Sequence, residues 1–92
     1  MTKLEENRAV INEVDRELTK LFEKRFAAVE GIVQYKMEKG LPVLDRSREE
    51  ELIRAREAEL PEYLRPYFRS WYEALMASSR QYQTDIIEQN KK

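Results

Sequence analysis

The fold of this chain is decided by its N-terminal segment, residues 5–38, which read EENRAVINEVDRELTKLFEKRFAAVEGIVQYKME. Apolar side chains recur there at steps of three and four residues, the spacing that lines up one face of an α-helix. They are Ile11, Val14, Leu18, Leu21, Phe22, Val29, Ile32 and Val33, and Leu4, just before the segment, continues the series. Gly40 and Pro42 follow, and both are typical of a helix end. The pattern therefore predicts one long helix over residues 5–38.

Two shorter helices are predicted after a short loop. Asp45 or Ser47 can cap the first of them, over residues 47–58, and the sequence from Ser47 also fits a capping box. The second is predicted over residues 62–89, because proline is tolerated in the first turn of a helix but not in its interior. No β-strand and no internal repeat is expected. The expected fold class is all-α, with residues 1–92 forming one three-helix domain.

The length of the first helix argues for a second chain. A helix of about 34 residues spans roughly 50 Å. A compact chain of 92 residues has a radius of gyration of only about 12 Å. The apolar stripe of a monomer would thus extend beyond its core into water. We therefore expect an intertwined homodimer in which the two long helices lie against each other.

The composition limits both the chemistry and the setting. The 92 residues carry a net charge of -1, so no overall basic field attracts nucleic acid. There is no histidine and no cysteine, which removes the commonest general base, thiolate nucleophiles and disulfides. No segment has the apolar character of a signal peptide or a membrane span. We expect a cytoplasmic protein without membrane or nucleic-acid partners, and any reaction it catalyses should need little proton transfer.

Several polar residues lie on or beside the apolar stripes, and together they indicate an anionic ligand. Arg25 and Lys36 are eleven residues apart, nearly three helical turns, so they point in the same direction. Ser79 and Gln83 are four residues apart and are neighbours on one face of the third helix. Taken singly, the cations fit solvated side chains whose stems cover apolar surface, and Ser79 with Gln83 fits a structural hydrogen bond.

Arg8 lies too far from Arg25 to share a ligand with it in one chain. Seventeen residues separate them, about 25 Å along one helix. In an antiparallel dimer, however, Arg8 of one subunit could approach Arg25 of the other. The sequence thus allows a site that is shared between two subunits.

In combination, these residues resemble the AroQ-class chorismate mutases of bacteria. The resemblance rests on Arg8, Leu21-Phe22-Glu23-Lys24-Arg25, Tyr35-Lys36, Gly40-Leu41-Pro42-Val43-Leu44-Asp45, Arg48-Glu49, Ser79 and Gln83, in this order and at compatible spacings. The resemblance covers nearly the whole chain, and the family varies in length mainly in the segment between the second and third helices. It implies a free-standing three-helix chain that forms an interlocked homodimer with two active sites. It also implies conversion of chorismate to prephenate by an intramolecular Claisen rearrangement, on the route to phenylalanine and tyrosine.

The resemblance assigns the catalytic roles to three residues. It implies that Arg25, together with Arg8 from the partner subunit, binds the two carboxylates of the substrate. Lys36 and Gln83 are implied to donate hydrogen bonds to the ether oxygen, where negative charge develops as the C–O bond breaks. Lys36, Gln83 and Arg25 are therefore the expected catalytic residues. No cofactor and no metal is expected, because the rearrangement is concerted and needs no proton shuttle or nucleophile.

Other polar residues are implied to bind the substrate. By the same resemblance, Glu49 and the backbone at Asp45 hold the ring hydroxyl, while Arg48 and Ser79 assist at the carboxylate end. Arg80 departs from the family pattern, since the best-known bacterial relatives are expected to have an apolar residue there. We expect the Arg80 side chain to face solvent, the alternative being an effect on carboxylate binding.

Two other functions fit part of the pattern. Isochorismate pyruvate lyases share this fold and the carboxylate-binding arginines. They differ in the loop and at the start of the second helix, where Asp45, Arg48 and Glu49 fit the mutases. A non-catalytic helical dimer, either a regulatory partner or an interaction module, fits the amphipathic helices, but the presence of Lys36 and Gln83 argues against it.

Overall fold

The computed structural model describes residues 1–91 and contains three α-helices. α1 spans Lys3–Lys39, α2 spans Arg46–Glu57 and α3 spans Arg65–Asn90, and a 3-10 turn, η1 (Glu62–Leu64), precedes α3. No β-strand occurs among the described residues, so the prediction of an all-α chain with a long first helix is confirmed. Within the same residues, no helix has both the length and the apolar content needed to cross a bilayer.

Local capping chemistry decides where α1 ends and where α2 begins. The Thr2 hydroxyl accepts a hydrogen bond from the Glu5 backbone N–H (3.1 Å) at the start of α1. Gly40 ends α1 in the left-handed region, with φ 66°, where other side chains are strained. The Asp45 carboxylate accepts from the Arg48 backbone N–H (3.0 Å), so Asp45 is the cap of α2. A short loop therefore joins two capped helix ends.

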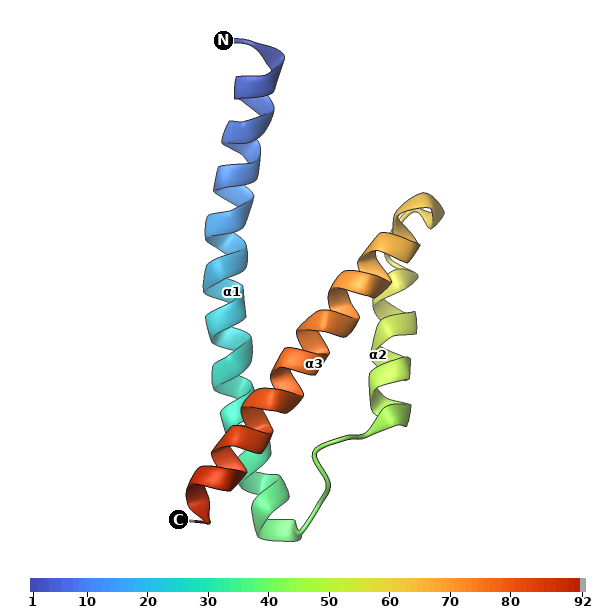
Figure 1. Ribbon diagram of the computed structural model, residues 1–92. Coiled ribbons are helices and arrows are strands. Elements are labelled where there is room, and N and C mark those ends of the chain that lie inside the picture. Colours follow the sequence, from blue (N-terminus) through green and yellow to red (C-terminus); the bar gives the residue numbers. More distant parts are fainter. Residues whose placement is uncertain (92) are drawn as a thin grey trace.

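The helices contact one another over only part of their lengths, and α1 extends well beyond the other two (Figure 1). α3 crosses the C-terminal half of α1, and α2 lies along the N-terminal half of α3. The small core follows this arrangement, with Ile53, Tyr72 and Met76 buried between α2 and α3, and Val29 and Val33 buried on α1. The radius of gyration is 16.7 Å, against about 12 Å for a compact chain of this length. A single chain is thus too extended to cover its own helices.

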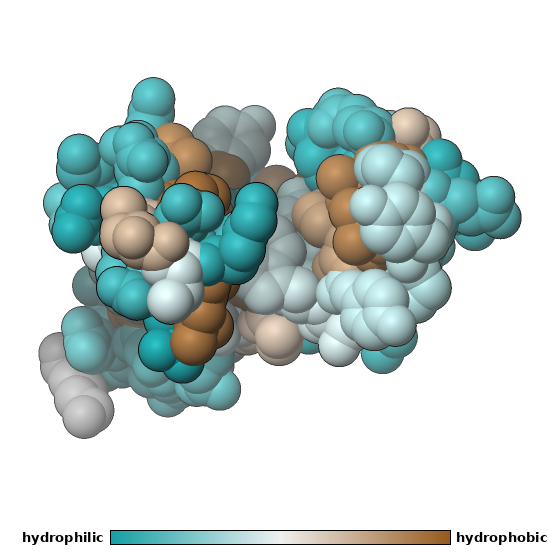
Figure 2. Space-filling model, turned by 90° about the horizontal axis from the view of Figure 1, so that it is seen from above, coloured by the Kyte–Doolittle hydropathy of each residue, from teal (hydrophilic) through white to brown (hydrophobic). Residues whose placement is uncertain are grey.

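The N-terminal half of α1 exposes an apolar face. Four residues of the predicted stripe, Leu4, Ile11, Val14 and Leu18, are between 42% and 58% exposed. Figure 2 looks down on the molecule, with the N-terminal half of α1 on the left and α2 with the N-terminal half of α3 on the right. It shows apolar side chains on the sides of the two lobes that face each other. An exposed apolar face of this kind is typical of a surface that another chain covers.

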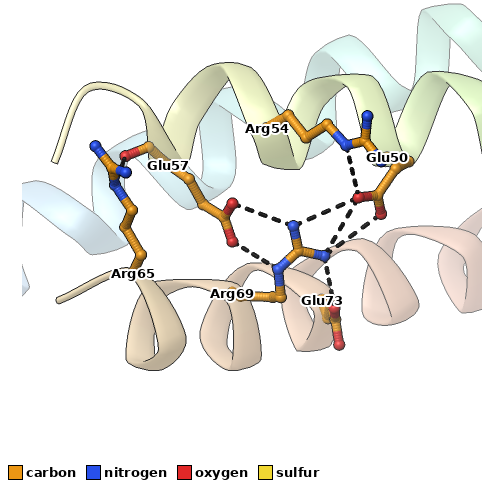
Figure 3. A network of polar contacts seen from close by, with 6 residues as sticks. All are labelled: Glu50, Arg54, Glu57, Arg65, Arg69 and Glu73. Atoms are coloured by element: carbon orange, nitrogen blue, oxygen red, sulfur yellow. Dashed lines mark hydrogen bonds and ion pairs between the residues drawn. The ribbon is translucent and has the colours of Figure 1, made fainter. Parts of the chain in front are cut away.

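Charged side chains around Arg69 tie α2 to α3 (Figure 3). The Arg69 guanidinium on α3 donates two hydrogen bonds to the Glu57 carboxylate on α2, at 2.6 and 3.1 Å. The same guanidinium lies 3.4 Å from Glu50, to which Arg54 donates at 3.1 Å. These contacts, chiefly the hydrogen bond from Arg69, hold the pKa of Glu50 below its ordinary value. The network is therefore complete only while Glu50 is ionised.

Acid should weaken this network. A carboxyl group whose pKa is lowered by folding stabilises the folded state above its unfolded pKa of 4.5, and the contribution is lost as the pH falls through the lowered value. Arg69→Met removes the main cause of the Glu50 shift. We expect wild type to be more stable than Arg69→Met at neutral pH, and the difference to shrink as the pH falls from about 5 to about 3.

Urea unfolding followed by circular dichroism measures this difference. Arg56→Met is the matched control, because Arg56 lies on α2, near Glu50, but pairs with Glu59. Its difference from wild type should lack this dependence on the ionisation of Glu50. A constant difference between wild type and Arg69→Met across the acid range would contradict the role given to Glu50.

Candidate active site

A cavity of about 440 Å³ lies where the three helices and the loop between α1 and α2 come together. Its polar lining contains every site residue predicted from the sequence except Arg8. The polar members are Arg25, Lys36, Asp45, Arg48, Glu49, Ser79, Arg80 and Gln83. The remaining wall is apolar and is formed by Ala28, Val29, Ile32, Val43, Leu52, Tyr72 and Met76. The crossing of α1 and α3 and the packing of α2 thus bring distant parts of the sequence to one place.

Lys36 and Gln83 contact each other across the crossing of α1 and α3. The Lys36 ammonium donates to the Gln83 side-chain oxygen (3.2 Å) and to the Val43 carbonyl in the loop (2.9 Å). An ammonium group can only donate, so the Gln83 amide must turn its oxygen toward Lys36. The amide NH2 group of Gln83, which is buried on α3, then remains available as a donor. One contact therefore orients two potential hydrogen-bond donors.

Arg25 carries a buried donor that has no partner within residues 1–91. Its Nη1 atom is buried and makes no hydrogen bond to the described residues. The guanidinium carbon lies 6.0 Å from the centre of the Tyr72 ring, so an aromatic face covers one side of the cation. Buried donors are nearly always satisfied in proteins. An unpaired guanidinium nitrogen in a cavity therefore points to an anionic ligand.

Arg80 lines the cavity, so the expectation that it faces solvent is wrong. Its Nη1 atom forms an ion pair with Oε1 of Glu49, which joins α3 to α2. Both side chains are partly buried, with 32% and 23% of their surface exposed. The sequence did contain a signal for this position, because Arg80 follows the buried Met76 by four residues and so lies on the same face of α3.

The other predicted residues have different degrees of exposure. Ser79 is buried on α3, one turn before Gln83. Asp45 and Arg48 are exposed at the rim, where the Asp45 carboxylate is occupied as the cap of α2. Arg8 is exposed on the N-terminal part of α1 and does not line the cavity. The single chain thus brings together all of the predicted site except Arg8.

The cavity wall has an excess of positive charge. Four cationic side chains and two carboxylates line it. Of the carboxylates, Asp45 caps a helix and Glu49 is paired with Arg80. Within residues 1–91, no carboxylate compensates Arg25 or Lys36, since Arg25 Nη1 is unpaired and Lys36 donates to Val43 and Gln83. The wall therefore suits a small ligand with more than one negative charge.

The apolar part of the wall was not predicted as part of the site. Tyr72 and Met76 on α3 and Leu52 on α2 belong to the core cluster and to the cavity lining at once. Their helical spacing predicts burial, which is equally true of residues that never meet a ligand. Only the packing of α2 against α3 shows that they also limit the volume open to a ligand.

These features define an all-helical protein with a cavity whose wall carries more cations than carboxylates. The sequence profile of the family described as Chorismate mutase type II matches residues 7–84, and the chain belongs to this family. The match confirms the resemblance to the AroQ class, and its range includes every predicted site residue from Arg8 to Gln83. No curated protein and no solved structure matches the chain.

Proposed function

We propose that the protein is a chorismate mutase that converts chorismate to prephenate by an intramolecular Claisen rearrangement. The observation that carries the proposal is the buried, unpaired Nη1 of Arg25 in the same cavity as the Lys36–Gln83 pair. The substrate has two carboxylates and an ether oxygen, so it needs cations for the former and donors for the latter. The proposed setting is phenylalanine and tyrosine biosynthesis in the cytoplasm.

The proposed rate enhancement comes from donors aimed at the ether oxygen. During the reaction the ether C–O bond breaks and a C–C bond forms within one molecule, while negative charge grows on the oxygen. Lys36 has three N–H donors and uses two of them for Val43 and Gln83, so one is left. The Gln83 amide NH2 lies on the same side chain that Lys36 orients. Such donors bind the transition state more strongly than the substrate.

The charged residues of the cavity would hold the substrate in its reactive, compact conformation. In the proposal, Arg25 and the partner subunit's Arg8 each bind one carboxylate through paired hydrogen bonds. Glu49 and the Asp45 backbone bind the ring hydroxyl. Fixing both ends of the molecule brings the reacting carbons together and removes an entropic part of the barrier. Two further wall residues assist at the carboxylate end, Arg48 and Ser79.

We also propose an intertwined homodimer. A second cavity, of about 630 Å³, lies between α1 and α3 and is lined mainly by apolar side chains, among them Leu18, Leu21, Phe22, Trp71 and Leu75. Arg25 lines this cavity as well as the polar one. A helix of a second chain that filled it would cover the exposed face of α1 and pass beside Arg25. That is where the proposed site needs the partner subunit's Arg8.

Product analysis tests the proposal. The purified protein is incubated separately with chorismate and with isochorismate, and its mass in solution is measured by light scattering. We expect prephenate from chorismate and twice the mass of one chain. Salicylate and pyruvate from isochorismate, without prephenate from chorismate, would show that the protein is an isochorismate pyruvate lyase and not a mutase. Absence of any product, together with failure to bind a bicyclic transition-state mimic, would favour a non-catalytic helical module.

Replacing Gln83 by glutamate should make the activity depend on acid. At neutral pH a carboxylate at this position would face the Lys36 ammonium and could not donate to the ether oxygen. Protonation would restore a donor, so Gln83→Glu should turn over chorismate faster as the pH is lowered, whereas wild type needs no acid. Steady-state rates across the pH range measure this. Gln89→Glu, an exposed amide on the same helix, is the matched control, and identical profiles for Gln83→Glu and wild type would contradict the contact.

A further inference from the structure

The ion pair between Arg80 and Glu49 has no part in the proposed catalytic roles. Arg80 lies on α3 directly after Ser79 and one turn before Gln83, and Glu49 lies in the first turn of α2. Both side chains line the polar cavity. The contact is made by Nη1 of Arg80 and Oε1 of Glu49. A cation that the family resemblance did not predict is therefore in direct contact with a proposed substrate-binding residue.

We propose that Arg80 is a positioning residue, which holds the Glu49 carboxylate ready for the ring hydroxyl of the substrate. The inference rests on the proposed mutase function, in which Glu49 accepts a hydrogen bond from that hydroxyl. Because Arg80 occupies Oε1, the free acceptor is Oε2. A glutamate side chain that is already fixed in one rotamer loses less entropy when the substrate binds.

Charge compensation gives Arg80 a second effect. The substrate is a dianion, and an unpaired Glu49 carboxylate in the same cavity would repel it. The guanidinium of Arg80 neutralises that carboxylate, and the partly buried position of the pair limits screening by solvent. Glu49 can then act as a hydroxyl acceptor without opposing the binding of the two carboxylates. A site that requires this hydroxyl should also reject analogues that lack it.

A merely structural link between α2 and α3 is the competing explanation. The Arg69 network already joins these two helices at Glu50, directly after Glu49, and at Glu57, about two turns further along α2 (Figure 3). Loss of the Arg80 contact should therefore change the site more than the fold. A structural role predicts lower thermal stability without selective loss of hydroxyl recognition, so the two explanations differ in what they change.

A double-mutant cycle on the full-length protein tests the positioning role. Arg80→Met should lower kcat/KM for chorismate by about 10- to 100-fold when Glu49 is present, the range for a hydrogen bond to a charged group. In the Glu49→Ala background the same change should cost less than about threefold, because no side-chain acceptor is left for Arg80 to position. Arg80→Lys should recover part of the loss, since it restores the charge but not the geometry. Arg56→Met is the control for an arginine outside the cavity.

The binding of two inhibitors, with and without the ring hydroxyl, gives a difference that a purely structural role of Arg80 would not change. A bicyclic dicarboxylate mimic is compared with its analogue lacking the ring hydroxyl. Arg80→Met should weaken binding of the first by about tenfold and of the second by less than about twofold. Equal weakening of both, or equal loss of kcat/KM in both Glu49 backgrounds, would overturn the inference. If circular dichroism shows that Arg80→Met does not fold, the same comparisons are made with Arg80→Gln.

The outcome for wild type separates this inference from the proposed function. A wild-type protein that forms no prephenate removes the proposed function and, with it, the role of Arg80. A wild-type protein that forms prephenate, with effects of Arg80 and Glu49 that are independent of each other, removes the role of Arg80 alone.

Discussion

Lys36→Ala should lower the turnover of chorismate by about 100- to 1,000-fold, the usual effect of removing a donor that stabilises developing negative charge. The structure adds a reason for a large effect, because the Lys36 ammonium also orients the Gln83 amide at 3.2 Å. Without Lys36 the amide is free to rotate, so two donors are lost or misaligned. The loss should appear in kcat more than in KM, since the negative charge on the ether oxygen develops only in the transition state.

Saturation kinetics, with circular dichroism to confirm folding, measure the effect of Lys36→Ala. Lys39→Ala is the matched control. Lys39 lies in the same last turn of α1, but its ammonium lies over the Tyr35 ring at 5.9 Å instead of in the cavity. Its kcat should stay close to that of wild type. A folded Lys36→Ala protein with near-normal kcat would exclude Lys36 from the proposed contact with the ether oxygen.

The helices could be predicted from sequence because their causes are local. Gly40 and Asp45 end α1 and begin α2 through their own backbone and side-chain chemistry, which a sequence pattern shows directly. The start of α3 was harder to predict from the sequence, since the residues between Pro61 and Pro66 first form the 3-10 turn η1 before α3 begins at Arg65. Spacing alone does not distinguish these two helical forms over so few residues.

The site could be predicted only where its residues lie at helical spacing or match a family pattern. Arg25 and Lys36 on one helix, and Ser79 and Gln83 on another, met that condition. The Arg80 contact with Glu49 did not, because it depends on how closely α2 packs on α3. The unpaired Nη1 of Arg25 is also a property of the packed structure, since only burial makes a missing partner significant.

Arg8→Ala and Arg25→Ala should each nearly abolish activity, and for the same reason. In the proposed shared site each arginine binds one substrate carboxylate, and removing one partner of such a pair typically lowers kcat/KM by more than about 100-fold. Arg8 lies outside the cavity of its own chain, about 25 Å along α1 from Arg25. A large effect of Arg8→Ala on a folded protein would therefore require a second subunit.

Mixing the two inactive variants should restore activity. In a dimer of one Arg8→Ala chain and one Arg25→Ala chain, one site combines the intact Arg25 of the first with the intact Arg8 of the second. The other site lacks both. Random reassociation after joint refolding from urea makes half of the dimers mixed, so about one quarter of wild-type activity should return. If Arg8 acted within its own chain, every site would keep a defect and mixing would restore nothing. The recovered fraction thus measures directly whether the cavity is completed by the partner's α1.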